Sequence, residues 1–150
     1  KNCVQALVGC LTDSEGEVRK VVAKALSRLG ERHWMPIILG VPNDFVQLGR
    51  FKDPRLLEAL VREANSSSPQ KRALVAEGLA FYNEALALDA VGKALQDKNP
   101  LVRKAVVLGV GKANQKGVAE KLLYLLDDED ENVRTAAMQT LDKLDKSQTG

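Results

Sequence analysis

The stretch DKNPLVRKAVVLGVGKAN, which runs from residue 97 to residue 114, decides the fold because it recurs along the chain. Its arginine, Arg103, has counterparts 31 residues later at Arg134 and 31 residues earlier at Arg72, within segments of similar apolar pattern. Arg19 lies in a related segment, but 53 residues before Arg72. Three successive units at one period are hard to obtain by chance, so we predict a repeat protein.

Each unit contains two amphipathic segments, which predict a pair of antiparallel helices. In the quoted stretch, Val102, Val106 and Val110 recur at the spacing of one helical face. Aromatic residues make up only 4% of the chain, so small aliphatic side chains must fill the core, which suits closely stacked helices better than a β-sandwich. We predict helix pairs at residues 2–11 with 14–30, 53–64 with 69–82, 85–96 with 100–114, and 117–127 with 131–144.

Capping signals mark where several of these helices begin. Ser68-Pro69 and Asn99-Pro100 each place an N-cap residue before a proline at the first helical position, and Asp53-Pro54 does the same for a first helix of a pair. Ser14 and Glu17 have the spacing of a capping box.

One column of the repeat stays small: Ala25, Gly78, Gly109 and Thr140. Glycine inside a helix costs helix propensity, so a small column usually marks the close approach of a neighbouring helix.

The period fails in residues 31–52, which hold a shortened unit with prolines at Pro36 and Pro42. We expect one short first helix, a turn near 40–43 and a brief second helix at about 43–51. The aromatic residues Trp34 and Phe45 lie here, and either they form a binding spot with His33 or they fill the gap left by missing turns. We favour the second interpretation, because apolar runs such as residues 34–39 usually bury.

The pattern resembles the HEAT-repeat family, and most closely its short-repeat, PBS-lyase-like branch. The resemblance rests on LGRFKDPRLLEAL at residues 48–60 and on an Asp…Val-Arg-x-x-Ala block that occurs three times. It implies an all-α solenoid of about five stacked antiparallel helix pairs, the second truncated, in a single domain spanning 1–150. The expected units are 1–30, 31–52, 53–83, 84–114 and 115–146, with 147–150 as a polar tail. Because the sequence begins at Lys1 without a Met, in a stretch that reads as the middle of a helix, we also expect a fragment of a longer chain or a processed form.

Two charged columns look ligand-like at first sight. They are an arginine column, Arg19, Arg72, Arg103 and Arg134, and an aspartate column, Asp13, Asp97 and Asp128. In the HEAT family such columns typically form a structural ladder, in which an arginine near the start of a second helix binds an acid or a carbonyl at the preceding turn. Ser66 replaces the aspartate in the third unit, which leaves that rung in doubt.

Composition excludes several classes of protein. The formal net charge of +2 is too small to indicate nucleic acid or an anionic membrane as the partner, and no apolar run is long enough to span a bilayer. Cys3 and Cys10 lie seven residues apart on one helical face, about 10 Å by helix geometry, too far for an intrahelical disulfide. Two reduced, partly buried thiols predict a cytoplasmic protein.

No chemistry-bearing constellation emerges, so we predict no catalytic, cofactor-binding or metal-binding residues and no cofactor. His33 is the only histidine, and zinc-ligand spacing is absent. The acidic run at residues 127–131 lacks the central glycine and distal glutamate of an EF-hand, and it suits the positive N-terminus of the following helix. Nucleotide-loop, nucleophile-elbow and metalloprotease motifs are also missing.

The second helices of stacked pairs typically line a concave face where solenoids bind extended partners. Projected outward, successive second helices show Lys20, Lys24 and Arg28, then Ala73, Glu77 and Phe81, then Lys104, Leu108 and Lys112, then Thr135, Gln139 and Lys143. Exposed apolar residues among charges mark protein-binding surfaces. The candidate partner-binding residues are Lys20, Lys24, Arg28, Trp34, Phe81, Lys104, Leu108 and Lys112. The alternative for Phe81 is that it packs inward with Tyr82.

We therefore expect a non-catalytic scaffold that binds another protein or peptide on its concave face, as a monomer or with weak self-association. Two alternatives remain. A bilin-lyase-like protein or subunit is implied by the family branch, although no acid–base cluster for it is visible. A HEAT-like nucleic-acid-binding or base-repair protein would need a concentrated basic groove with stacking aromatics, of which the lysines offer only a thin version. Nucleic acid is thus a disfavoured partner, and no membrane is expected.

Overall fold

The computed structural model describes residues 2–34 and 44–149, and within these ranges the regular structure is entirely helical. The elements are α1 (Asn2–Gly9), η1 (Cys10–Thr12), α2 (Gly16–Arg28), η2 (Arg32–Trp34), α4 (Asp44–Arg50), α5 (Pro54–Glu63), α6 (Pro69–Leu79), α7 (Ala85–Ala94), α8 (Pro100–Lys112), η3 (Lys116–Val118), α9 (Ala119–Leu122), η4 (Leu123–Asp127) and α10 (Glu131–Thr149).

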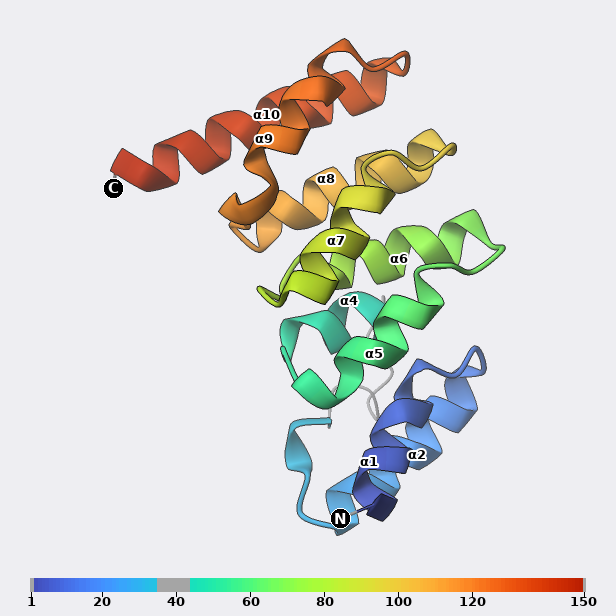
Figure 1. Ribbon diagram of the computed structural model, residues 1–150. Coiled ribbons are helices and arrows are strands. Elements are labelled where there is room, and N and C mark those ends of the chain that lie inside the picture. The colour runs from blue at the N-terminus through green and yellow to red at the C-terminus, as the bar shows by residue number, and fades with distance from the viewer. Residues whose placement is uncertain (1, 35–43, 150) are drawn as a thin grey trace.

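The helices form two layers that run side by side along a stack (Figure 1). One layer contains the first helices of the pairs, α1, α5, α7 and α9, and the other contains the second helices, α2, α4, α6, α8 and α10. The N-terminus lies at one end of the stack and the C-terminus at the other. The predicted all-α solenoid is confirmed.

The helix starts follow the capping signals in three cases out of four. The side chains of Asp53, Ser68 and Asn99 each accept a hydrogen bond from a backbone N–H of the helix that follows, and each precedes a proline in its first turn. The predicted capping box at Ser14 is wrong, because α2 begins after Glu15 without a side-chain cap. The carboxylate of Asp13 instead accepts from the Glu15 N–H (2.8 Å), which closes a turn and delays the helix.

The last helix is longer than predicted. α10 continues to Thr149, past the predicted helix end at residue 144, so residues 147–149 are helical. The Ser147 hydroxyl lies 2.9 Å from the Asn114 side-chain oxygen, which joins the end of α10 to the end of α8.

The small column lies where the second helices cross. A Cβ added at Gly78 would meet the Phe45 carbonyl of α4, and one added at Gly109 would meet the Glu77 backbone of α6. Gly49 of α4 is tighter still, since its added Cβ would overlap the backbone of Gly78. The predicted close approach of neighbouring helices is therefore confirmed.

These crossings bend the stack. From α4 onward, successive second helices contact one another much more extensively than successive first helices do, as α6 with α8 compared with α5 with α7 shows. A stack with one closely spaced layer and one spread layer curves toward the closely spaced side. The second helices therefore line the concave face.

The shortened unit is filled by aromatic side chains. Its second helix, α4, lies close to the predicted 43–51, whereas the predicted first helix falls mostly on 35–43, outside the described residues. Trp34 is fully buried and meets Phe51 edge to face at 5.1 Å between ring centroids. Phe45 is buried beneath the Arg19 guanidinium, 5.3 Å from its ring centroid. Trp34 and Phe45 therefore fill the gap in the stack, and the His33 side chain is not among those described.

Three predictions about the first unit are wrong. The apolar spacing of the first unit also predicts that Val18 in α2 and Leu29 just after α2 lie in the core, but both are exposed. Cys3 and Cys10 are exposed free thiols, whereas the sequence predicts partly buried ones. All four belong to the first unit, which has no described helix pair before it.

Candidate functional site

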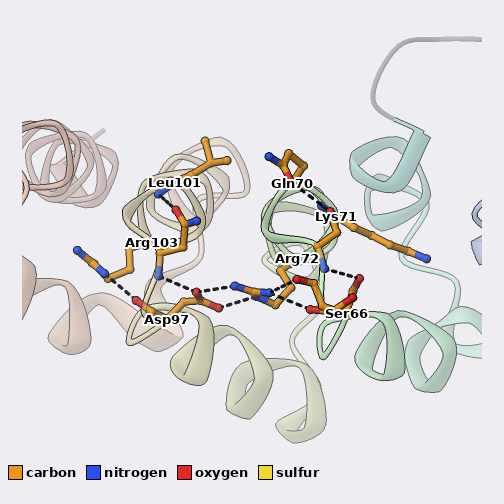
Figure 2. A network of polar contacts seen from close by, with 10 residues as sticks. Ser66, Gln70, Lys71, Arg72, Asp97, Leu101 and Arg103 are labelled. Carbon is orange, nitrogen blue, oxygen red and sulfur yellow. Dashed lines mark hydrogen bonds and ion pairs between the residues drawn. The ribbon is translucent and has the colours of Figure 1, made fainter.

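Arg72 connects two units of the stack (Figure 2). Its Nε and Nη2 donate to the two carboxylate oxygens of Asp97 in the next unit, at 2.9 and 3.1 Å. Its Nη1 donates to the carbonyls of Ser66 (2.9 Å) and Ser67 (3.2 Å) in the turn before its own helix. Replacement of the aspartate by Ser66 does not break this rung of the ladder, because Arg72 binds the backbone carbonyl of Ser66 and not its side chain.

Arg103 repeats the arrangement one unit later. It makes two 2.9 Å hydrogen bonds to the Asp128 carboxylate and one of 2.7 Å to the Asp97 carbonyl. The Arg103 and Asp128 side chains are only 8% and 7% exposed. Asp97 thus binds Arg72 through its carboxylate and Arg103 through its carbonyl, so that one residue joins two arginines.

The end members of the columns bind carbonyls. Arg19 donates to the Asp13 carbonyl at 2.6 Å, and Arg134 donates to the carbonyls of Asp128 (2.6 Å) and Glu129 (3.2 Å). The structure therefore brings the predicted arginine and aspartate columns together, but the carboxylate comes from a different turn than expected. Each arginine takes carbonyls from its preceding turn, and the carboxylate, where present, comes from the following unit.

The arginines and aspartates of the ladder neutralise each other's charge. Burial alone would raise the pKa of Asp128, but the hydrogen bonds from Arg103 and the Asp130 N–H outweigh it and lower that pKa. The pKa of Asp97 is lowered in the same way, with Arg72 and the Asn99 N–H as donors against the effect of burial. Carboxylates held ionised by arginines are poor proton donors and acceptors near neutral pH. This arrangement favours a structural role.

The sequence patterns did not indicate a second charged cluster, which is centred on Arg55. Arg55 binds the Asp53 carboxylate (2.6 Å) and the Glu31 carboxylate (2.8 Å), and these two acids, Asp53 first, raise the pKa of its guanidinium. The Tyr82 hydroxyl donates to the Asp53 carbonyl at 2.9 Å. Only the Asp53-Pro54 cap signalled this place. The cluster fastens the shortened unit to the third unit.

A groove of about 630 Å³ lies on the side of the first helices. Its walls come from α5, α7 and the turn between α5 and α6, and the Arg72–Asp97 pair is part of its lining. Asp89 and Lys93 at its edge form an ion pair of 3.1 Å. No repeat pattern indicated this groove, because it arises from the spreading of α5 from α7.

The concave face differs from its prediction at α6. Phe81 is buried beneath the Arg50 guanidinium, 5.1 Å from its ring centroid, and Glu77 is buried in an ion pair with Lys112. Phe81 and Trp34 are therefore not surface residues, and the prediction that they contact a partner is wrong. Their neighbour Tyr82 also packs inward.

The remaining candidate residues stay accessible on either side of α6. Lys24 and Arg28 are exposed on α2, and Lys20 is partly exposed in an ion pair of 2.9 Å with Glu17. On α8, Lys104, Leu108 and Lys112 are exposed. On the second helices, the exposed basic side chains Lys24, Arg28, Lys104 and Lys143 form no ion pair with another described residue. The concave face is thus basic, with Leu108 as an apolar spot.

The described residues do not support a metal site or a membrane-spanning helix. No group of three or more histidine, cysteine, aspartate or glutamate side chains in residues 2–34 and 44–149 is placed to hold a metal ion. In the acidic run, Asp128 binds Arg103 and Asp130 accepts from the Val133 N–H at the start of α10 (3.1 Å). Across the same ranges, each helix is too short or too polar to cross a bilayer.

Comparison with known families agrees with this architecture. A family model described as HEAT repeats matches residues 54–142, and one described as HEAT repeat matches residues 3–33. The matches do not single out the short-repeat, PBS-lyase-like branch. No curated protein matches the chain significantly.

Proposed function

This chain belongs to the HEAT-repeat family, and we propose that it is a non-catalytic scaffold whose concave face binds an acidic segment of a partner protein. HEAT repeats commonly serve as protein-interaction scaffolds, and solenoids bind extended partners along their concave side. The observation that carries the proposal is the basic character of the exposed second-helix surface on α2, α8 and α10.

The charge distribution supports an acidic partner. Lys24, Arg28, Lys104 and Lys143 lie on the second helices without ion-pair partners among the described residues. Unpaired surface cations raise the association rate and select against basic partners, while they add little affinity when exposed. Leu108, exposed between Lys104 and Lys112, supplies an apolar contact that charge alone does not give.

The pairing of the buried arginines and aspartates supports a non-catalytic role. Arg72 binds Asp97 and Arg103 binds Asp128, and carboxylates held ionised by arginines are poor proton donors and acceptors near neutral pH. The exposed free thiols of Cys3 and Cys10 support the prediction of a reducing compartment, the cytoplasm.

A peptide-display selection tests the proposal. A random peptide library is selected on the immobilised chain, and enriched peptides are synthesised and titrated by fluorescence anisotropy. We expect acidic peptides with one or two apolar residues. Lys104→Glu should weaken their binding about 10-fold or more, since the charge at this contact changes by two units, from positive to negative, and Leu108→Ser should weaken it several-fold.

The matched control is Arg62→Glu on α5. Arg62 is an exposed basic residue near the end of a first helix, so it carries the same charge change on the opposite layer. Its effect on binding should be under about 2-fold at 0.15 M salt, where charges beyond about 8 Å are largely screened. Peptides without acidic enrichment, or equal losses for Arg62→Glu and Lys104→Glu, would contradict the proposal.

A further inference from the structure

The basic surface of the second helices has a break at α6. Ala73, Glu77 and Phe81, the three positions of this segment that were expected to face outward, are all buried. None of them is a cation, and Glu77 is an acid that binds Lys112 of α8. An acidic segment that crosses the second helices would therefore meet no cation from these positions of α6.

Arg50, the last residue of α4, supplies a cation at this break. α4 packs on α6, and the Arg50 guanidinium lies over the Phe81 ring, 5.1 Å from its centroid. Arg50 is exposed, and it forms no ion pair with another described residue. Residues 35–43, which precede α4, contain no aspartate or glutamate. The charge of Arg50 is therefore available to a partner.

Backbone contacts define how α4 is aligned with the other second helices. The Thr140 hydroxyl of α10 donates to the Val107 carbonyl of α8 at 3.4 Å. Gly78 of α6 belongs to the same column of the repeat as Thr140, and a Cβ added to it would lie 2.5 Å from the Phe45 carbonyl of α4. Phe45 of α4 therefore takes the place that Val107 has in α8.

This alignment makes Arg50 the counterpart of Lys112. Lys112 follows Val107 by five residues, and Arg50 follows Phe45 by five residues. The column then holds a basic residue on four of the five second helices: Arg28, Arg50, Lys112 and Lys143. Phe81 is the exception, and Arg50 covers it. The sequence period does not reveal Arg50 because the shortened unit breaks the 31-residue spacing.

The contact with Phe81 restrains the Arg50 side chain. A cation within about 6 Å of an aromatic centroid is attracted to the ring, and Phe81 is itself buried. A restrained side chain loses less conformational entropy on binding than a free one does. The planar fork of N–H donors on an arginine matches the two oxygens of a carboxylate. Arg50 is therefore suited to bind one carboxylate through two hydrogen bonds.

We propose that Arg50 is a specificity-determining residue of the concave face, whose guanidinium binds one aspartate or glutamate side chain of the acidic partner segment. This inference rests on the proposed function of that face. Lys24 and Lys104 attract negative charge without selecting its geometry, because an ammonium group acts as a point charge. Arg50 adds a requirement for a carboxylate at one defined place, between the cations of α2 and those of α8, and so fixes the register of the segment.

Two substitutions of Arg50 test the proposal, with acidic peptides selected on the wild-type chain titrated by fluorescence anisotropy. Arg50→Lys keeps the charge and removes the fork, so binding should weaken about 5-fold or more. Arg50→Met removes both while its unbranched side chain still covers Phe81, so binding should weaken about 10-fold or more. Thermal melts should show that both variants fold. A folded Arg50→Lys variant that binds as the wild type does would overturn the proposal.

Arg28→Lys is the matched control. Arg28 is exposed in the same column, at the end of α2, but no aromatic ring lies against its guanidinium within the described part of the chain. The same exchange should therefore change binding less than about 2-fold. Equal losses for Arg28→Lys and Arg50→Lys would show that exposed arginines contribute alike, and would overturn the special role of Arg50.

Amide substitution in the peptide identifies the contact. Each aspartate or glutamate of the peptide is replaced in turn by asparagine or glutamine, and each peptide is titrated against the wild type and Arg50→Met. At one position the amide should weaken binding about 10-fold to the wild type and less than about 2-fold to Arg50→Met, because only a direct partner couples to Arg50. A purely structural role would weaken every peptide by the same factor, and that result would overturn the proposal.

Lys104→Glu separates this inference from the function on which it rests. If Lys104→Glu weakens binding and neither Arg50 variant does, the acidic segment binds the concave face without Arg50, and this inference alone is overturned. If none of the three variants weakens binding, the concave face is not the binding surface, and both proposals are overturned.

Discussion

The ion pair between Arg103 and Asp128 should be the strongest single connection between two units of this stack. Both side chains are nearly excluded from solvent, and two hydrogen bonds of 2.9 Å join them. The informative change is Asp128→Asn, because asparagine can still accept from the Asp130 N–H as the aspartate does. The turn is kept, and the charge is removed from one side of the pair.

The expected cost follows from leaving a buried guanidinium without its counter-ion. Breaking one partner of a buried ion pair costs about 3–5 kcal/mol. Arg103 keeps its bond to the Asp97 carbonyl, and an amide oxygen remains at position 128, so we expect about 2–3 kcal/mol for Asp128→Asn. Arg103→Met should cost a similar amount. The double variant should cost clearly less than the two together, since no unpaired charge then remains.

The assay is urea denaturation followed by far-UV circular dichroism, applied to the wild type, both single variants and the double variant. A coupling energy of about 1.5 kcal/mol or more is expected from this cycle. Additive effects, or a loss under about 0.5 kcal/mol for each single variant, would refute the conclusion that the ladder stabilises the stack.

The same pair predicts how stability depends on pH. The pKa of Asp128 in the folded chain lies below its ordinary value of 3.8, so the pair stabilises the fold at pH values above that ordinary value. As the pH falls through the lower folded pKa, protonation removes this contribution. The wild type should therefore lose more stability than Asp128→Asn on acidification from about pH 5 to pH 2, measured as the shift in urea midpoint. Parallel curves for the two proteins would contradict this assignment.

Four further changes test packing and backbone. Gly49→Ala should destabilise the fold by at least about 3 kcal/mol, because the new Cβ would overlap the Gly78 backbone. In Gly9→Ala the new Cβ meets no atom within 4 Å, so this variant should gain up to about 1 kcal/mol of stability. Thermal melts should show the two melting temperatures shifted in opposite directions. Gln115→Ala should cost about 2–3 kcal/mol in urea denaturation, since its side-chain amide donates to the Ala80 and Tyr82 carbonyls of an earlier unit and accepts from the Gly117 N–H of its own turn. Lys52→Gly should stabilise by about 1 kcal/mol because φ is 54° there, and an unchanged or lower melting temperature would contradict that reasoning.

Local sequence signals predicted the elements of this fold well, because they act over a few residues. The proline and cap pairs at Asp53, Ser68 and Asn99 begin helices as expected, and the 31-residue period brings Arg72 to Asp97 and Arg103 to Asp128. Such features depend on spacing within one unit or between adjacent units, and spacing is visible in a sequence.

Exposure was harder to predict, because it depends on neighbours that one helix does not specify. The predicted helix 69–82 placed Phe81 on its outer side, but α6 ends at Leu79 and the Arg50 guanidinium of the shortened unit lies over the Phe81 ring. Val18 has the pattern of an interior unit but lies at an end of the stack, where no described unit covers it. The groove between α5 and α7 depends on how far two helices spread, and a periodic pattern has no signal for that distance.

The most direct test of the central claim, that the concave face is the functional surface, is a backbone amide NMR titration. A peptide selected on the wild-type chain is added to isotope-labelled protein. The account predicts chemical-shift changes concentrated on the outer positions of α8 and α10, around Lys104 and Leu108, and extending toward Lys24 on α2. Changes concentrated instead along the groove between α5 and α7 would contradict it.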